Sequence, residues 1–135
     1  MYDMLIRMRY MGIDFGTKRV GVAFSNEGGT MAFPHDVLKN DESLLKSFIA
    51  LAKEHKVDAI VIGHSIGRNG IPNKVQKAID ELIGDLTLEL AVPIHLEPEQ
   101  YTTQEALRIQ GKNEKTDASA ASLILNSYLT KLKSL

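Results

Sequence analysis

The sequence predicts an α/β fold in which helices cover the faces of one mixed β-sheet. Residues 10–24 read as two strands joined by a glycine turn, and residues 31–37 read as a third strand. Residues 57–63 are a nearly unbroken apolar run, which is typical of a parallel strand covered on both faces. Apolar residues at helical spacing follow. We therefore expect three antiparallel strands, then parallel strands and helices.

The first strand is expected to end at an aspartate. Residues 10–13 are apolar, so this strand should be central and buried, and Asp14 should lie where the core meets solvent. Gly16 allows a ligand or a backbone segment to approach that carboxylate, and Gly21 indicates a bulge or a close backbone contact. Pro34 places the third strand near a sheet edge.

The later elements alternate between helix and strand. Ala118, Ala120 and Ala121 permit the last helix to pack closely on the sheet. Residues 1–7 are predicted to be an N-terminal extension and residues 8–135 a single domain, because this length supplies one sizeable core. The expected elements are a helix over residues 40–56, a strand over 57–63, a helix opened by Pro72, an edge strand over 90–96 containing Pro93, a helix from Thr102 or Thr103 to about Ile109, and a helix from Thr116 to Leu132.

Composition narrows the class of protein. The net charge of −1 argues against bulk electrostatic coating of nucleic acid. The absence of cysteine excludes a disulfide framework and a cysteine metal site. No apolar run is long enough to span a membrane, and residues 1–7 lack the features of a signal peptide, so we expect a cytoplasmic protein with no membrane partner.

Acidic residues are expected to meet at one edge of the sheet. In open α/β sheets the functional crevice lies at the carboxyl ends of the strands. Asp14 ends the first strand, Glu97 and Glu99 follow the fifth, and Asp117 begins the last helix. Clustered carboxylates repel one another unless a cation neutralises them, and Mg²⁺ prefers such oxygen ligands. Position alone leaves open which of Glu97 and Glu99 takes part.

Other interpretations of these residues remain open at this point. Asp14 and Gly16 fit an ordinary turn, a phosphate-binding loop of the actin and sugar-kinase type, or a nuclease metal ligand. Asp117 fits a helix cap. The four histidines show no ligand spacing, and only His64 lies in an expected crevice loop.

Four motifs resemble one known family. Residues 8–23 are similar to the opening of the YqgF family, also called RuvX or Holliday-junction-resolvase-like proteins. Residues 61–63 with Asn69-Gly70 resemble its strand-and-loop motif, and residues 99–106 resemble its Asp-Glu-Arg-Leu-Thr-Thr-x-Glu-Ala motif. Residues 117–129 resemble its C-terminal signature. Together, in this order and length, the motifs are specific.

The resemblance implies a ribonuclease H-like fold and a metal-dependent nuclease. Family members are described as nucleases that process the 5′ end of precursor 16S rRNA and as Holliday-junction resolvases. The family's carboxylates carry over to Asp14, Glu99 and Asp117, as catalytic residues and as ligands of Mg²⁺ or, alternatively, Mn²⁺. The resemblance thus favours Glu99 over Glu97.

This chain departs from the family pattern at several positions. Pro98 replaces the family's Asp, Gln100 its Arg, His64-Ser65 its Leu-Pro and Asn26 its Asp. The loss of an arginine removes a bidentate phosphate contact, which affects the grip on substrate more than metal binding.

The leading hypothesis is a nuclease that acts on structured RNA or branched DNA, as a monomer or a weak dimer. Lys18, Arg19, Arg108 and Lys112 are the expected phosphate contacts. One alternative is a nucleotide-binding ATPase, although such enzymes enclose nucleotide between two large domains and this chain has room for one. The other is a non-catalytic protein that binds RNA or the ribosome.

Overall fold

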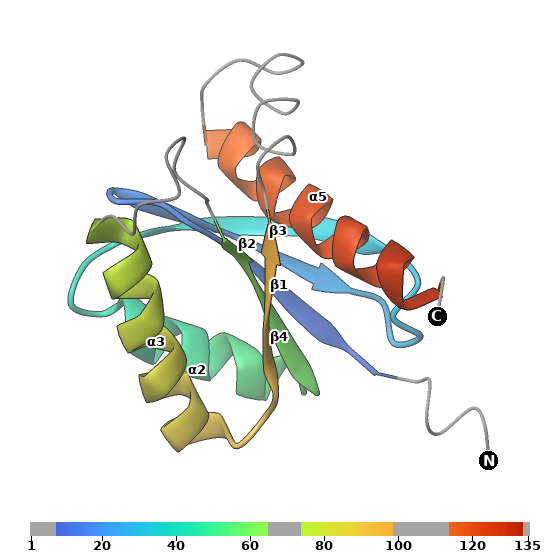
Figure 1. The fold of residues 1–135 in the computed structure, drawn as a ribbon, viewed down its shortest axis with the longest axis horizontal. Coiled ribbons are helices and arrows are strands. Elements are labelled where there is room, and N and C mark those ends of the chain that lie inside the picture. The colour runs from blue at the N-terminus through green and yellow to red at the C-terminus, as the bar shows by residue number, and fades with distance from the viewer. Residues whose placement is uncertain (1–7, 65–73, 99–113, 134–135) are drawn as a thin grey trace.

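The computed structural model describes residues 8–64, 74–98 and 114–133, and within them five strands form one sheet in the order β3-β2-β1-β4-β5 (Figure 1). β2 pairs antiparallel with both β1 and β3, whereas β4 pairs parallel with β1 and β5 pairs parallel with β4. This confirms the predicted mixed sheet. The elements are β1 (Tyr10–Phe15), β2 (Arg19–Ser25), β3 (Ala32–Lys39), α2 (Leu44–Glu54), β4 (Ala59–His64), α3 (Lys74–Leu90), β5 (Ile94–Pro98) and α5 (Glu114–Lys133).

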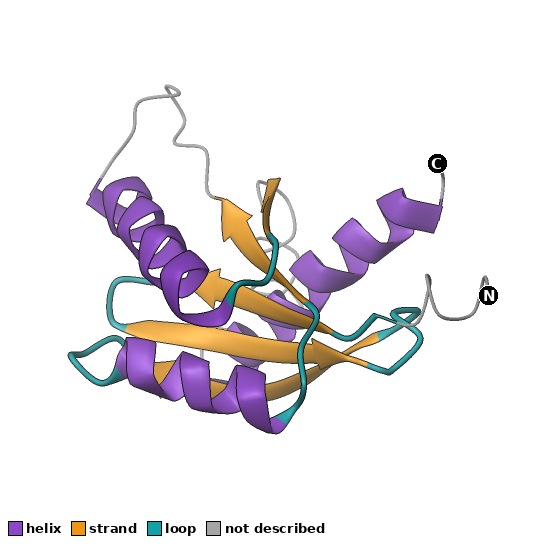
Figure 2. Ribbon diagram, turned by 90° about the horizontal axis from the view of Figure 1, so that it is seen from below, coloured by secondary structure: helices purple, strands orange, loops and turns teal. Residues whose placement is uncertain are grey.

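Helices cover both faces of the sheet. α2 and α3 lie on one face and α5 lies on the other, so the strands form the middle of three layers (Figures 1 and 2). The larger apolar cluster lies under α2 and α3 and includes Ile13, Val22 and Phe48. A smaller cluster lies under α5 and includes Tyr10, Val61 and Leu125. The continuous apolar run of β4 is explained by this double cover, because its residues alternate between the two clusters.

The alternation along β1 decides which residues face α5. Met11, Ile13 and Phe15 belong to the cluster under α2 and α3. Successive side chains of a strand point to opposite faces, so Gly12 and Asp14 lie on the face that α5 covers. The position of Asp14 is therefore fixed by the buried residues on either side of it.

The boundary between α3 and β5 differs from the prediction. We expected a strand over residues 90–96, but α3 continues to Leu90 and β5 spans Ile94–Pro98. Leu82 and Leu86 keep α3 packed on the core, and the helix ends where Ala91 takes a left-handed conformation with φ of 52°. As predicted from Pro93, β5 is an edge strand.

Some predictions fall outside the described residues. They are the extension over residues 1–7, the helix start at Pro72 and the helix from Thr102 or Thr103 to Ile109.

Of the helices over residues 44–54, 74–90 and 114–133, none has the length and apolar character needed to cross a membrane.

Candidate active site

Asp14 is half-buried near the carboxyl end of the central strand β1. Its backbone pairs with Gly21 of β2, so it lies at the last part of the hairpin before the turn. In that turn, a Cβ on Gly16 would lie 2.5 Å from the backbone oxygen of Arg19. The glycine is required there because the backbone of the returning strand approaches closely; of the two expected neighbours, ligand or backbone, the structure shows backbone.

The turn after Asp14 is held by the segment that follows β3. The side-chain amide of Asn40 donates a hydrogen bond to the carbonyl of Gly16 at 2.8 Å. The backbone N–H of Asn40 donates to the carbonyl of Lys18 at 2.9 Å. Two bonds from one residue thus fix the β1–β2 turn against the end of β3.

α5 runs antiparallel to β1, on the face of the sheet opposite to α2 and α3. Near the start of β1, the rings of Tyr10 and Tyr128 lie 6.0 Å apart between centroids. Further along β1, a Cβ on Gly12 would lie 2.9 Å from Cβ of Leu125 and 3.1 Å from the carbonyl oxygen of Ala121. The strand therefore advances toward lower residue numbers of the helix, and at Gly12 the two backbones are almost in contact.

This geometry places Asp14 and Asp117 at the same level of the sheet. From Gly12 to Asp14 the strand advances by roughly 6.6 Å. From Ala121 back to Asp117 the helix advances by about 6 Å, and these two positions lie on the same helical face. The structure describes the backbone of Asp117 within α5 but not its side chain.

Glu97, the alternative to Glu99, is engaged in a contact between β5 and α5. It is only 2% exposed. Its carboxylate accepts a hydrogen bond from Ser127 at 3.0 Å and forms an ion pair with Lys131. Glu97 therefore ties the edge strand to α5 and would have to give up a lysine to bind a metal. Glu99 lies outside the described residues.

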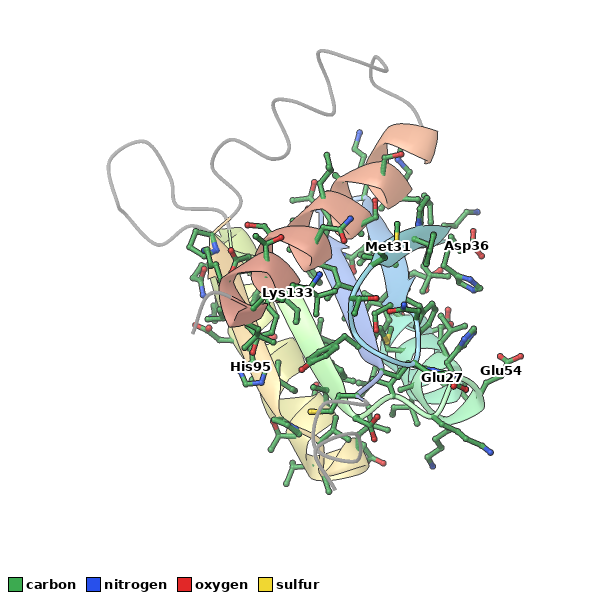
Figure 3. The ribbon with its side chains drawn as sticks, turned by 90° about the vertical axis from the view of Figure 1, so that its right-hand side faces the viewer. Glu27, Met31, Asp36, Glu54, His95 and Lys133 are labelled. Carbon is green, nitrogen blue, oxygen red and sulfur yellow. The ribbon has the colours of Figure 1, made fainter. Side chains whose placement is uncertain are left out.

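The C-terminal half of α5 also packs on β5 through a ring contact. Figure 3 shows α5 in front of the strands, with His95 beneath the end of the helix that carries Lys133. The rings of His95 and Tyr128 stack with centroids 5.2 Å apart. Burial raises the pKa of the Tyr128 phenol, with smaller contributions from Tyr10 and Glu97.

The donor set of the expected metal site has suitable chemistry. Carboxylate oxygens are the ligands that Mg²⁺ uses in proteins, together with water and substrate phosphate. In the part of the chain that the structure describes, no group of three or more His, Asp or Glu residues is gathered around one point. That part includes Asp14 but neither Glu99 nor the side chain of Asp117, so the assignment of these three residues stays a prediction.

The expected phosphate contacts divide in the same way. Lys18 is exposed and Arg19 is half-buried, and both lie at the β1–β2 turn next to Asp14. Arg108 and Lys112 lie outside the described residues, as does the side chain of His64. Lys39, which the sequence alone did not single out, lies directly opposite Arg19 in the β2–β3 pairing. This relation between Lys39 and Arg19 depends on the register of β2 with β3, which the sequence does not show directly.

The order and directions of the strands, with helices on both faces, define a ribonuclease H-like fold. Two solved structures share this fold across nearly their whole length. RuvC from T. thermophilus, in complex with a Holliday junction substrate, has a TM-score of 0.63 at 12% identity and covers 93% of this chain and 96% of its own. The fowlpox virus Holliday junction resolvase has a TM-score of 0.59 at 12% identity and covers 93% and 99%.

The chain belongs to the RuvX family, whose model is described as Holliday junction resolvase and matches residues 8–131. A relative from Nitratidesulfovibrio vulgaris, named "Putative pre-16S rRNA nuclease", is 32% identical and covers 90% of this chain and 93% of its own. A relative of the same name from Rickettsia akari is 25% identical, with 98% and 92% covered. The family resemblance seen in the motifs is therefore confirmed, and the chain is an enzyme of the nuclease class.

Proposed function

We propose that this chain is a metal-dependent nuclease that hydrolyses phosphodiester bonds in precursor 16S rRNA. Asp14, Glu99 and Asp117 would hold Mg²⁺, with Mn²⁺ as a substitute. The observation that supports the proposal is the close contact between Gly12 and α5, from which regular strand and helix geometry puts positions 14 and 117 at about the same level. A cytoplasmic location is part of the proposal, because a precursor rRNA would be met there.

The residues of the site would act mainly by position and charge. The half-buried setting of Asp14 strengthens its electrostatic interactions relative to those of an exposed carboxylate. Bound Mg²⁺ would supply charge neutralisation at the scissile phosphate and a lowered pKa of the attacking water. Lys18 and Arg19 beside the turn, with Arg108 and Lys112, would attract and orient the phosphate backbone.

Precursor rRNA is the favoured substrate because the relatives named as pre-16S rRNA nucleases are more similar in sequence to this chain than the junction resolvases are. They are 25% and 32% identical to this chain, whereas the solved junction resolvases are 12% identical and support the fold alone. Cleavage of a four-way DNA junction is the second candidate, and the description of the family model favours it. Non-catalytic binding to RNA is the alternative that Pro98 and Gln100 keep open.

The test compares Asp14→Asn with Asp36→Asn, an identical change on exposed β3. Cleavage with Mg²⁺ is measured on a precursor 16S rRNA leader and on a four-way DNA junction. We expect wild type and Asp36→Asn to cut the leader at equal rates and Asp14→Asn to lose at least about 100-fold, as for loss of a major electrostatic group in an active site.

Three outcomes would contradict the proposal in different ways. Equal rates for Asp14→Asn and wild type would remove Asp14 from the mechanism. Cleavage of the junction but not the leader would transfer the function to branched DNA. Tight binding of the leader without cleavage by any variant would show that the protein binds RNA without cutting it.

A further inference from the structure

Two cations face each other across the second hairpin. In the antiparallel pairing of β2 with β3, Arg19 lies directly opposite Lys39. Directly opposed residues have their Cβ atoms about 5 Å apart, and like charges in this position destabilise a sheet. Two positive charges this close together attract anions such as phosphate.

The opposed cations lie on the same face of the sheet as Asp14. Their neighbours Val20 and Leu38 pack into the cluster under α2 and α3. Alternation along both strands therefore turns Arg19 and Lys39 toward the α5 side, where Asp14 also lies. Figure 3 shows Asp36, three positions before Lys39 on β3, pointing outward from the molecule.

The cations border a depression of about 560 Å³ beside the β1–β2 turn. Hydrogen bonds from Asn40 hold its wall in place. Among the described lining residues the acidic one is Asp41, whose carboxylate accepts two hydrogen bonds from Ser43 that hold its pKa below the ordinary value. The described lining thus holds three cationic residues and one acidic residue. The lining residues are Thr17, Lys18, Arg19, Val37, Leu38, Lys39, Asn40 and Asp41.

We propose that this depression, with Arg19 and Lys39 at its centre, binds a phosphate of the nucleic-acid strand that is presented to Asp14. The inference rests on the proposed function, because it assigns a second contact to the same substrate. β3 lies two strand spacings from β1, about 10 Å, so a bound phosphate would lie on the backbone close to the one presented to Asp14. The site would hold the backbone next to the cleavage position.

The variant Lys39→Gln removes one phosphate contact, and Lys53→Gln is its control. Lys53 is exposed on α2, on the opposite face of the sheet. Binding of a labelled precursor 16S rRNA leader is measured by fluorescence anisotropy at salt concentrations from about 50 to about 400 mM. This range spans about one decade of concentration, which is enough to measure the slope of affinity against salt. We expect Lys39→Gln to weaken binding roughly 5–8-fold near 0.1 M salt and to reduce the salt slope by about 0.7–0.9. Lys53→Gln should change neither.

The variant Lys39→Glu separates binding from folding. It places a glutamate opposite Arg19, which replaces a like-charge pair by an opposite-charge pair. We expect its melting temperature to equal or exceed that of wild type while its RNA affinity falls further than that of Lys39→Gln. Lower melting temperature with unchanged affinity would overturn the inference, because Lys39 would then serve the fold.

The outcomes also separate this inference from the proposed function. If Asp14→Asn abolishes cleavage but Lys39→Gln keeps the wild-type affinity and salt slope, the phosphate site is wrong and the nuclease stands. If Lys39→Gln weakens binding as expected but wild type cleaves nothing, the phosphate site stands and the nuclease fails. Inorganic phosphate that shifts the NMR signals of Lys39, with RNA affinity unchanged in Lys39→Gln, would assign the site to free phosphate and overturn the inference.

Discussion

The close approach of β1 and α5 at Gly12 predicts the effect of a single added methyl group. In Gly12→Ala the new Cβ would meet Cβ of Leu125 at 2.9 Å and the carbonyl oxygen of Ala121 at 3.1 Å. The first atom belongs to the base of a fully buried side chain and the second to a helix backbone, so neither can rotate away. The helix must move off the sheet.

The cost can be estimated from two opposing terms. Overpacking of a well-packed core costs about 1–3 kcal/mol. Replacing glycine by alanine in a strand returns roughly 0.5–1 kcal/mol of backbone entropy. We therefore expect a net loss of about 1–2 kcal/mol in the free energy of unfolding and a melting temperature lower by roughly 3–10 °C for a chain of this size.

The assay combines unfolding with cleavage. Denaturant unfolding gives the loss of stability, and cleavage is measured well below the melting temperature so that the protein is folded. A shift of α5 would separate the positions of Asp117 and Asp14, and a displacement of about 1 Å can cost roughly 100-fold in rate. The control is Gly84→Ala in α3, where the added Cβ would meet nothing within 4 Å.

The control variant Gly84→Ala should gain up to about 1 kcal/mol in the free energy of unfolding, because alanine forms helices more readily than glycine. If Gly12→Ala is as stable and as active as wild type, the contact between β1 and α5 does not set the site, and the level placement of the two aspartates loses its basis.

Three further predictions concern the fold. Lys131→Met should destabilise the protein by about 3 kcal/mol and Glu97→Gln by less, because the first leaves a buried carboxylate without its cation while the second leaves an exposed lysine; equal losses in urea unfolding would contradict this asymmetry. Phe48→Ala should cost roughly 3–5 kcal/mol, since this fully buried ring lies at the centre of the α2 contact; a loss under about 1 kcal/mol in the same assay would show that α2 is not packed as described. Ser43→Ala should raise the pKa of Asp41 toward its ordinary value. Because that pKa is depressed in the folded state, its stabilising effect is present above the unfolded pKa and fades as the pH falls through the folded one, so the two proteins should converge in stability at low pH; an unchanged NMR titration of Asp41 would refute the assigned cause.

Hydrophobic pattern was enough to predict the sheet. Residues 57–63 specified a strand covered on both faces, and the structure places β4 between β1 and β5 with helices above and below. Pattern failed at the end of α3, where Leu90 fits both a helix face and a strand. The packing of Leu86 on the core decided for the helix, and such a tertiary contact is invisible in local sequence.

The site was predictable in part. The position of Asp14 followed from a buried strand ending in an acid. Glu97 and Glu99 could not be separated by position, because the ion pair that engages Glu97 comes from α5, more than thirty residues away. Lys39 was missed for a related reason, since its relation to Arg19 exists only through the register of β2 with β3.

The proposed nuclease mechanism depends most on the convergence of carboxylates from distant segments on shared metal ions. Crystals soaked in Mn²⁺ and measured at its absorption edge test this directly. We predict an anomalous peak about 2.1 Å from a carboxylate oxygen of Asp14, the distance expected for a small divalent cation, with Glu99 or Asp117 as a further ligand. A well-occupied ion elsewhere, with the carboxylate of Asp14 bound to none, would contradict the account.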